Sequence, residues 1–231
     1  MAKIKGLLFD KDGTLFDFHA TWGVWCAGFI ADVSEGDGAV ASALAKAMDY
    51  DLENSAFLPS SVMIADSMDG IMDAVHSALP HWERGALMEY VVETASNAPQ
   101  APVTDLGPLL ARFRASGLKI GLATNDNEAP ARAHLTSVSV LEHFDFISGC
   151  DTGFGAKPEP GMLLGFADAM GLQPSEVAMI GDSTHDLRAG RAAGMVNIGV
   201  LTGPAVFGDL APFADVVLRD IGEIPEWLGL D

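Results

Sequence analysis

The chain has 231 residues, which is enough to bury a core in one large domain or in two modest ones. Hydrophobic residues make up 49% and charged residues 19%, which excludes a disordered composition and is typical of a globular protein. With 13 Lys and Arg against 32 Asp and Glu, the formal charge of −19 argues against a nucleic-acid partner, because like charges repel.

The chain lacks the sequence features of exported and membrane proteins. Its first residues contain neither the long apolar stretch nor the cleavage site of a signal peptide, and no window approaches 18 uninterrupted apolar residues. Cys26 and Cys150 are too few for a disulfide framework, and their apolar surroundings predict buried free thiols. We therefore expect a cytoplasmic protein with no membrane partner.

Short apolar runs that end in polar residues recur along the chain and predict strands. The runs span residues 4–9, 118–123, 144–148, 177–180, 196–200 and 214–218. Helical patterns lie between the later runs, at residues 106–116, 129–138, 161–170 and 184–193. Alternating short strands and helices predict an α/β fold with a central parallel sheet that helices cover on both faces.

Residues 18–97 have a different pattern. Their periodic stretches are rich in aromatic residues, alanine and methionine, and span residues 21–33, 39–50, 67–79 and 84–96. This region contains no convincing strand, and the Pro- and Ala-rich segment 98–102 that follows it is typical of a linker. We expect residues 1–17 and 98–231 to form an α/β core, and residues 18–97 to form an inserted all-helical domain.

Polar residues lie at or beyond the ends of four predicted strands. In chain order, these residues are Asp10 and Asp12, Thr124 and Asn125, Lys157, and Asp182 with Asp186. Each has an ordinary structural explanation when taken alone, such as a turn, a helix cap or a surface lysine. The carboxyl ends of parallel strands meet at one edge of a sheet, where ligands bind. The joint placement of these residues therefore favours a functional site.

This set of motifs resembles that of the haloacid dehalogenase superfamily. The matching segments are Asp10-x-Asp12-Gly13-Thr14, Thr124-Asn125, Lys157-Pro158 and Gly181-Asp182-x-x-x-Asp186, which together span most of the chain. The insert after the first strand is similar to the helical cap of the branch that contains phosphoglycolate phosphatases and β-phosphoglucomutases. The resemblance implies a Rossmann-like three-layer core, a helical cap domain and Mg²⁺-dependent phosphoryl transfer.

The resemblance also implies a role for each acidic residue. Asp10 would attack phosphorus and form an aspartyl-phosphate, and Asp12 would protonate the leaving alcohol and then accept a proton from water. Mg²⁺ would be held by Asp10, Asp182 and the backbone carbonyl of Asp12, with Asp186 as an outer-shell partner. Clustered carboxylates repel one another, which is an independent reason to expect the cation.

The remaining motif residues would bind the phosphoryl group. Lys157 would offset negative charge on Asp10 and on the phosphate. Thr124, the backbone of Asn125 and the region of Gly13 would supply hydrogen bonds to the phosphate oxygens.

The presence of the second acid, Asp12, distinguishes phosphate-ester hydrolysis from dehalogenation. The dehalogenase branch lacks it because no leaving alcohol needs a proton there. Phosphonate hydrolysis needs a cap lysine, whereas Lys46, the only lysine of residues 18–95, lies in an Ala-rich stretch that is expected to be peripheral. We expect a phosphatase for a small-molecule phosphate ester such as 2-phosphoglycolate. A β-phosphoglucomutase-like phosphomutase and a non-catalytic binding protein remain open, as does the choice between monomer and homodimer.

Substrate recognition is expected in the insert. His19 and Trp22 follow the acidic loop closely, and they either line the pocket entrance or, more commonly for such residues, pack between cap helices. Further candidates in the insert are Met63, Ser67, Met68 and Asp69. Arg132 could reach a second anionic group, although a surface salt bridge is the more common role for such an arginine.

Overall fold

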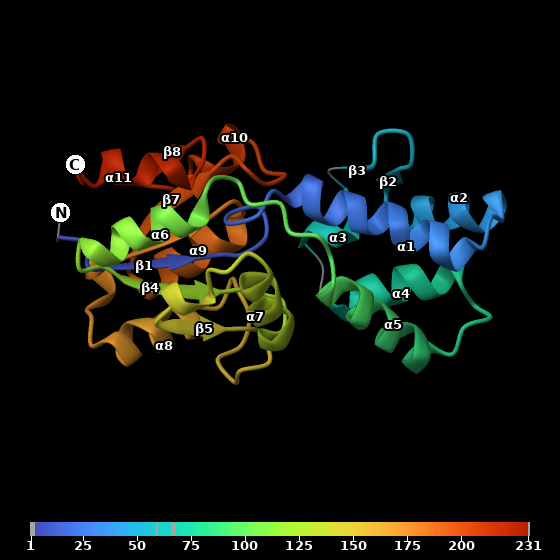
Figure 1. Ribbon diagram of the computed structural model, residues 1–231, viewed down its shortest axis with the longest axis horizontal. Coiled ribbons are helices and arrows are strands. Elements are labelled where there is room, and N and C mark those ends of the chain that lie inside the picture. The colour runs from blue at the N-terminus through green and yellow to red at the C-terminus, as the bar shows by residue number, and fades with distance from the viewer. Residues whose placement is uncertain (1–2, 59, 66–67, 231) are drawn as a thin grey trace. The chain divides into compact units, whose positions relative to one another are not determined.

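A computed structural model describes residues 3–58, 60–65 and 68–230 of the chain (Figure 1). The chain divides into two compact units. The first, which we call the α/β unit, consists of Met1–Phe18 and Gln100–Asp231. The second, which we call the helical unit, consists of His19–Pro99.

Within the described residues, the α/β unit contains one six-stranded parallel sheet with the order β5-β4-β1-β6-β7-β8. The strands are β1 (Gly6–Phe9), β4 (Lys119–Ala123), β5 (Phe146–Ser148), β6 (Val177–Gly181), β7 (Val196–Val200) and β8 (Val216–Leu218). All six strands predicted from apolar runs are confirmed. Strand β1 is internal, with Phe9 opposite Leu122 of β4 and opposite Ile180 of β6.

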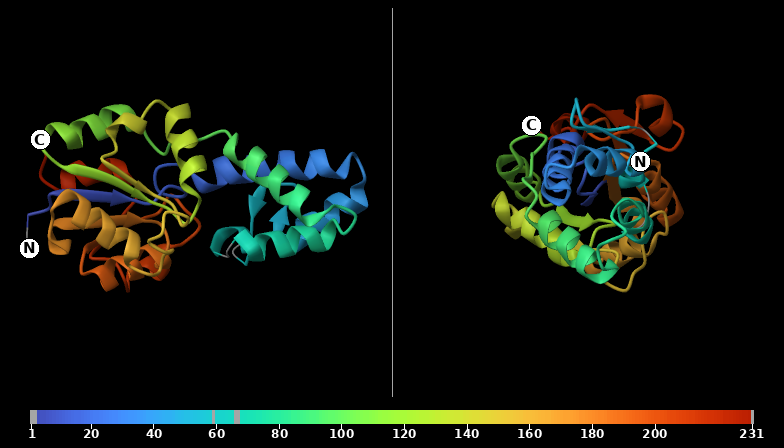
Figure 2. Two further views of the ribbon diagram at one scale, coloured as in Figure 1. Left: turned by 90° about the horizontal axis from the view of Figure 1, so that it is seen from below. Right: turned by 90° about the vertical axis from the view of Figure 1, so that its right-hand side faces the viewer.

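Helices cover both faces of this sheet, so the α/β unit has three layers (Figure 2). The main helices are α6 (Leu106–Ala115), α7 (Glu128–Ser137), α8 (Gly161–Met170) and α9 (Thr184–Ala193). Successive strand residues point to opposite faces. Phe9 therefore packs in the cluster that contains Phe113 of α6, whereas Leu8 packs in the cluster that contains Phe166 of α8. The expected α/β fold with helices on both faces is confirmed.

Shorter helical segments complete the α/β unit. They are η2 (Leu141–His143), η3 (Pro174–Glu176), α10 (Phe207–Leu210), η4 (Ile221–Glu223) and α11 (Ile224–Trp227). Ile221 and Ile224 are fully buried in the same cluster as Phe9, so the last part of the described chain contributes to the core.

The helical unit is mainly α-helical, as expected. Its helices are η1 (His19–Gly23, a π-helix), α1 (Val24–Ser34), α2 (Gly38–Ala47), α3 (Val62–Ala65), α4 (Met68–Ala78) and α5 (Arg84–Ser96). The expectation that it contains no strand is wrong, because β2 (Tyr50–Asp51) pairs antiparallel with β3 (Ala56–Phe57). Strands of two residues are too short to produce the alternation by which a strand is recognised.

Local contacts explain why the chain forms this hairpin. The carboxylate of Asp51 accepts hydrogen bonds from the backbone N–H groups of Glu53 and Asn54 at 2.9 and 3.2 Å, which closes the turn. The rings of Tyr50 and Phe57 meet across the strands with centroids 5.1 Å apart.

The structure also bears on the expectations about membrane spans and about the two cysteines. No helix in the described part of the chain combines the length and the hydropathy that a membrane span requires. Both cysteines are free, but only Cys26 is buried. Cys150 is partly exposed because it lies in the loop after β5, so the expectation of burial is wrong for this residue.

Candidate active site

The order of the sheet brings three polar segments side by side. Strand β1 lies between β4 and β6, so the carboxyl ends of these three strands are neighbours. Asp10 follows β1, Thr124 follows β4 and Asp182 follows β6. The backbone N–H of Asp10 donates to the carbonyl of Ile180 at 2.8 Å, which continues the β1–β6 ladder to the start of the loop. The functional side chains therefore start from the rigid centre of the sheet.

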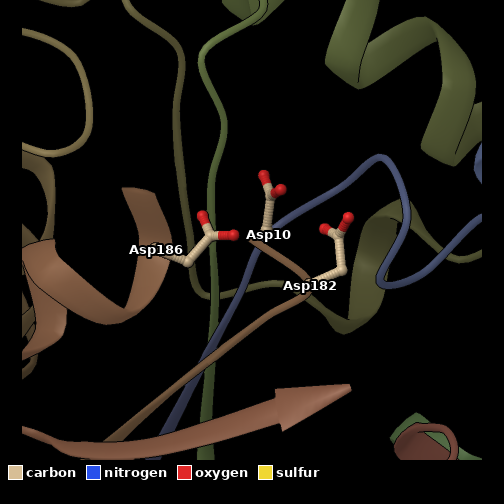
Figure 3. Close-up of side chains that lie close together, drawn as sticks. All are labelled: Asp10, Asp182 and Asp186. Carbon is tan, nitrogen blue, oxygen red and sulfur yellow. The ribbon is translucent and has the colours of Figure 1, made fainter. Parts of the chain in front are cut away.

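Asp10, Asp182 and Asp186 form an acidic cluster at this edge (Figure 3). One carboxylate oxygen from each residue lies within 4.8 Å of the others. In the close-up view the three side chains lie side by side with their carboxylates on the same side of the strands. Asp182 is 4% exposed and Asp186 is fully buried.

Asp186 is fixed by the first turn of α9. Ser183 is the N-cap of this helix, and its backbone N–H and its hydroxyl donate to Oδ2 of Asp186 at 3.0 and 2.7 Å. The hydroxyl of Ser183 also accepts a hydrogen bond from the backbone N–H of Asp186, which completes a capping box. Oδ2 of Asp186 is thus bound by Ser183, whereas Oδ1 faces the cluster.

Two glycines make room for the carboxylate of Asp182. Gly13 has a φ of +75°, which other residues rarely adopt, and a Cβ placed on it would lie 2.3 Å from Oδ2 of Asp182. A Cβ on Gly203 would lie 1.7 Å from the same oxygen. The hydroxyl of Thr14 donates to the other oxygen, Oδ1, at 3.3 Å. The position of Asp182 therefore depends on the absence of side chains at residues 13 and 203.

Lys157 brings a positive charge to the cluster from the loop between β5 and α8. Its Nζ lies 2.6 Å from Oδ1 of Asp10 and 2.6 Å from Oδ1 of Asp186, and its side chain is 3% exposed. Burial lowers the pKa of Lys157, but the carboxylates of Asp10 and Asp186 outweigh burial and raise the pKa above its ordinary value. Lys157 is therefore a permanent cation in this site.

One lysine does not balance three carboxylates. Burial is the largest influence on Asp10 and raises its pKa to about 7, with Lys157 opposing the rise and Asp186 adding to it. The pKa of Asp182 is raised well above its ordinary value by burial and then by the carboxylates of Asp186 and Asp10. The cluster is thus a place where the protein alone stabilises negative charge poorly.

The donor set fits a hard divalent cation. Mg²⁺ prefers carboxylate, carbonyl and water oxygens at about 2.1 Å in octahedral geometry, so its ligand oxygens lie roughly 3 to 4 Å apart. One carboxylate oxygen from each of Asp10, Asp182 and Asp186 lies within 4.8 Å of the others, which is near this spacing, and the raised pKa values of Asp10 and Asp182 indicate that the site lacks positive charge. The described residues can therefore hold a Mg²⁺ ion at the carboxyl ends of β1 and β6.

The predicted phosphate-binding residues lie around the same edge. Thr124 is 2% exposed, and its hydroxyl accepts a hydrogen bond from the backbone N–H of Asp126 at 3.1 Å. The carbonyl of Gly13 accepts from the hydroxyl of Thr202 at 2.6 Å. The side chain of Asn125 is bonded to the backbone of Lys157, so this asparagine also orders the loop that carries the lysine.

The other predicted residues fall outside this cluster. Arg132 forms an exposed ion pair with Glu128 at 2.6 Å, which is the surface salt bridge that the sequence favoured. His19 is exposed and Trp22 packs edge-to-face on Trp25 in the helical unit, with ring centroids 5.7 Å apart. Their role in substrate recognition stays a prediction. Ser67 and the side chains of Met68 and Asp69 lie outside the described residues.

Several residues of the site were missed by the sequence analysis. Lys11, between the two motif acids, is fully buried and pairs with Asp12 at 2.8 Å. A lysine two residues after the apolar run of residues 4–9 was the available signal, because buried lysines occur with partners. Gly203 is not indicated by the sequence either, since a glycine in a loop is too common to indicate a role.

Comparisons with known proteins agree with the geometry. The model of the haloacid dehalogenase-like hydrolases matches residues 4–194. The phosphoglycolate phosphatase of Neisseria meningitidis is 28% identical over 240 residues, which cover 97% of this chain and 89% of that protein. The phosphoglycolate phosphatase of Chromobacterium violaceum is 34% identical over 169 residues, which cover 68% of this chain and 74% of that protein.

Solved structures show the same fold at lower identity. A HAD family hydrolase from Deinococcus radiodurans, with bound phosphate and sodium, has a TM-score of 0.71 and 19% identity, covering 100% of this chain and 98% of its own. The L-2-haloacid dehalogenase of Xanthobacter autotrophicus has a TM-score of 0.67 and 17% identity, with 98% of each chain covered. Proteins with different named reactions thus share this architecture, and the reaction must be argued from the site.

Proposed function

The chain belongs to the haloacid dehalogenase-like hydrolases, and we propose that it is a Mg²⁺-dependent phosphatase that hydrolyses a small phosphomonoester through an aspartyl-phosphate on Asp10. In this proposal residues 1–17 and 98–231 form the catalytic core and residues 18–97 form the cap. The observation that carries it is the contact of Lys157 with Asp10, 2.6 Å apart, inside a cluster of carboxylates that fits Mg²⁺.

Asp10 is the proposed nucleophile. Phosphoryl transfer requires an in-line oxygen nucleophile and neutralised phosphate charge rather than elaborate covalent chemistry. The ammonium of Lys157 fixes one oxygen of Asp10 and reduces its repulsion of an incoming phosphate. Mg²⁺, when bound, supplies the additional positive charge that keeps Asp10 ionised and offsets the charge of the phosphoryl group.

The metal ligands divide into two kinds. Asp10, Asp182 and the backbone carbonyl of Asp12 are proposed to bind Mg²⁺ directly. Asp186 is proposed as an outer-shell partner, because Lys157 contacts its Oδ1 and Ser183 donates to its Oδ2. A carboxylate held in this way would support the direct ligands of the ion from outside without leaving its own hydrogen bonds.

Asp12 is proposed as the general acid and base. Its side chain is partly exposed, and it follows Asp10 by two residues in the loop at the site. Protonation of the leaving oxygen matters for esters of alcohols, because an alkoxide is a poor leaving group. The phosphate oxygens would receive hydrogen bonds from Thr124, Gly13 and the backbone of Asn125.

The relatives and the residues present support the proposed substrate class. Relatives over most of the chain are named phosphoglycolate phosphatases, which makes 2-phosphoglycolate the first substrate to test. Phosphonate hydrolysis needs a lysine of the cap. It is disfavoured because the lysine available there, Lys46, is exposed on α2. Selection among phosphate esters is proposed to reside in the cap, where His19 and Trp22 remain the candidates.

A phosphate-release assay tests this function. Purified protein is incubated with 2-phosphoglycolate, sugar phosphates, nucleotides and p-nitrophenyl phosphate, each with Mg²⁺ and with EDTA. We expect Mg²⁺-dependent release of phosphate from at least one ester. A phosphomutase would instead interconvert glucose 1- and 6-phosphates with little free phosphate, and absence of both activities with every divalent metal would contradict the proposal.

A further inference from the structure

The loop after β1 carries a buried lysine that the mechanism above does not use. The side chain of Lys11 has no exposed surface. Its Nζ lies 2.8 Å from Oδ2 and 3.0 Å from Oδ1 of Asp12. The same nitrogen lies 3.0 Å from Nδ1 of His134 and 3.3 Å from Oδ2 of Asp126. We call these four residues the Lys11 cluster.

The Lys11 cluster joins three separate elements of the α/β unit. Lys11 and Asp12 belong to the loop after β1, Asp126 belongs to the loop after β4, and His134 lies on α7 and is 1% exposed. Asp126 is itself held, because its backbone N–H donates to Thr124 and its Oδ1 accepts from the backbone N–H of Asn127 at 2.8 Å. The lysine is thus anchored to a rigid part of the core.

The charge of Lys11 is stable despite its burial. Its ammonium pairs with the carboxylates of Asp12 at 2.8 Å and Asp126 at 3.3 Å, so its positive charge is compensated inside the core. An ammonium can only donate hydrogen bonds, so Nδ1 of His134 is the acceptor in this contact. Burying a charge is costly unless it is paired, so a buried lysine at this position calls for an explanation.

The geometry assigns a function to this pairing. We propose that Lys11, anchored by Asp126 and His134, is a positioning residue that holds the carboxyl group of Asp12 toward the leaving oxygen of the substrate. This inference rests on the proposed phosphatase function, because it requires Asp12 to deliver a proton. Lys11 touches neither the ester nor Asp10 in this scheme and acts only through Asp12.

The chemical step that Lys11 supports transfers the phosphoryl group to Asp10 and a proton from Asp12 to the departing oxygen. An oxygen of Asp10 forms a bond to phosphorus as the bond from phosphorus to the alcohol oxygen breaks. The O–H bond of the Asp12 carboxyl group breaks, and its proton forms a new O–H bond on the departing oxygen. Asp12 is then a carboxylate with both oxygens facing the ammonium of Lys11, so the lysine stabilises the negative charge that develops there.

The dependence of the hydrolysis rate on the leaving group distinguishes a positioning role of Lys11 from a purely structural one. An ester of an acidic phenol expels a stable anion and needs little help from a general acid, whereas an ester of a weakly acidic phenol or an alcohol needs much. Damage to the fold, to the metal site or to phosphate binding would slow all such esters by a similar factor. Loss of an aligned general acid slows the poor leaving groups selectively.

The experiment compares wild-type protein with Lys11→Met, which keeps the length of the side chain and removes its charge. kcat/KM is measured with Mg²⁺ on 2,4-dinitrophenyl, p-nitrophenyl, phenyl and 4-methylphenyl phosphates. We expect a fall of about 10- to 100-fold for the last two and of less than about 3-fold for the first. Lys119→Met makes the same change at an exposed lysine of β4 and should leave all four values unchanged.

Two further variants guard against misfolding and test the route of action. His134→Leu removes one anchor of Lys11 and should show the same selectivity for leaving groups with a smaller factor. In an Asp12→Asn background, Lys11→Met should cause no further loss on phenyl phosphate, because a residue that acts through Asp12 has nothing left to position. Thermal unfolding of each variant checks that the protein is folded.

The outcomes separate this inference from the proposed function. If wild-type protein releases no phosphate from any ester, the phosphatase function fails and the role of Lys11 fails with it. If wild-type protein is active but Lys11→Met changes all four esters by the same factor, only the positioning role is overturned. An undiminished effect of Lys11→Met in the Asp12→Asn background would overturn it as well.

Discussion

The side chain of Asn125 makes two hydrogen bonds to the backbone of Lys157. The N–H of Lys157 donates to Oδ1 of Asn125 at 2.8 Å, and Nδ2 of Asn125 donates to the carbonyl of Lys157 at 3.0 Å. The loop after β4 thereby fixes the loop that presents the lysine to Asp10. Asn125 and Lys157, which lie 32 residues apart in sequence, are thus joined directly, so a change at Asn125 should shift the loop that carries Lys157.

Asn125→Ala tests this relationship. The variant should lower kcat on the best phosphomonoester about 10-fold or more, because Lys157 loses the support that aligns its Nζ. The free energy of unfolding should fall by no more than about 1.5 kcal/mol, because Asn125 is exposed and water can replace its partners. The matched control is Asn127→Ala, which removes an exposed asparagine two residues away. Equal losses of activity in the two variants would contradict the proposed support.

Gly203→Ala tests the space around Asp182. The added Cβ would lie 1.7 Å from Oδ2 and 2.7 Å from Cβ of Asp182, so the whole side chain must move. We expect the Mg²⁺ concentration for half-maximal activity to rise at least about 10-fold, because a displaced ligand weakens the metal site. Gly208→Ala is the control, because a Cβ there meets nothing within 4 Å. Unchanged Mg²⁺ dependence in Gly203→Ala would refute the proposed metal ligand.

Stability should depend on pH more strongly without metal than with it. Without metal, Asp10 has a pKa of about 7 in the folded protein against 3.8 in the unfolded chain. A raised carboxyl pKa gives stability that is present at low pH and is lost as pH rises through the interval from about 4 to about 7. In EDTA, Tm should therefore increase when pH is lowered from 8 to 6.

Magnesium should reverse much of this loss. It binds the ionised carboxylates, so the increase in Tm on adding Mg²⁺ should be larger at pH 8 than at pH 6, where protons compete for the same oxygens. At about 100 times its dissociation constant, Mg²⁺ should add roughly 2.7 kcal/mol to the free energy of unfolding. Asp182→Asn should lose most of this increase. The same small increase at both pH values in wild-type protein would contradict the metal site.

Much of the fold could be predicted because its signals are local. A fully buried parallel strand is apolar along its whole length, and β1, with all four residues buried, is an example. The helices α8 and α9 match residues 161–170 and 184–193 because glycine ends each of them in a left-handed conformation, at Gly171 and Gly194. The β2–β3 hairpin was missed because two residues per strand give no periodicity.

The site could be predicted only where the residues follow strand ends. Asp10, Thr124 and Asp182 were placed by that rule, since the sheet order makes their strands neighbours. The Lys11 cluster could not be placed, because Lys11 and His134 are 123 residues apart and nothing in the spacing indicates that α7 packs over the loop after β1. Roles for His19 and Trp22 depend on a substrate that no sequence pattern identifies.

The central claim, that Asp10 carries the phosphoryl group, can be tested by trapping the intermediate. Wild-type protein turning over its best ester with Mg²⁺ is quenched, reduced with borohydride and digested with trypsin. Cleavage after Lys5 and Lys11 releases the peptide Gly6–Lys11, in which Asp10 is the only carboxylate side chain. Reduction of an aspartyl-phosphate converts this residue to homoserine. We predict that mass spectrometry finds homoserine in this peptide, dependent on substrate and Mg²⁺, and that its appearance elsewhere, or full turnover by Asp10→Asn, would contradict the account.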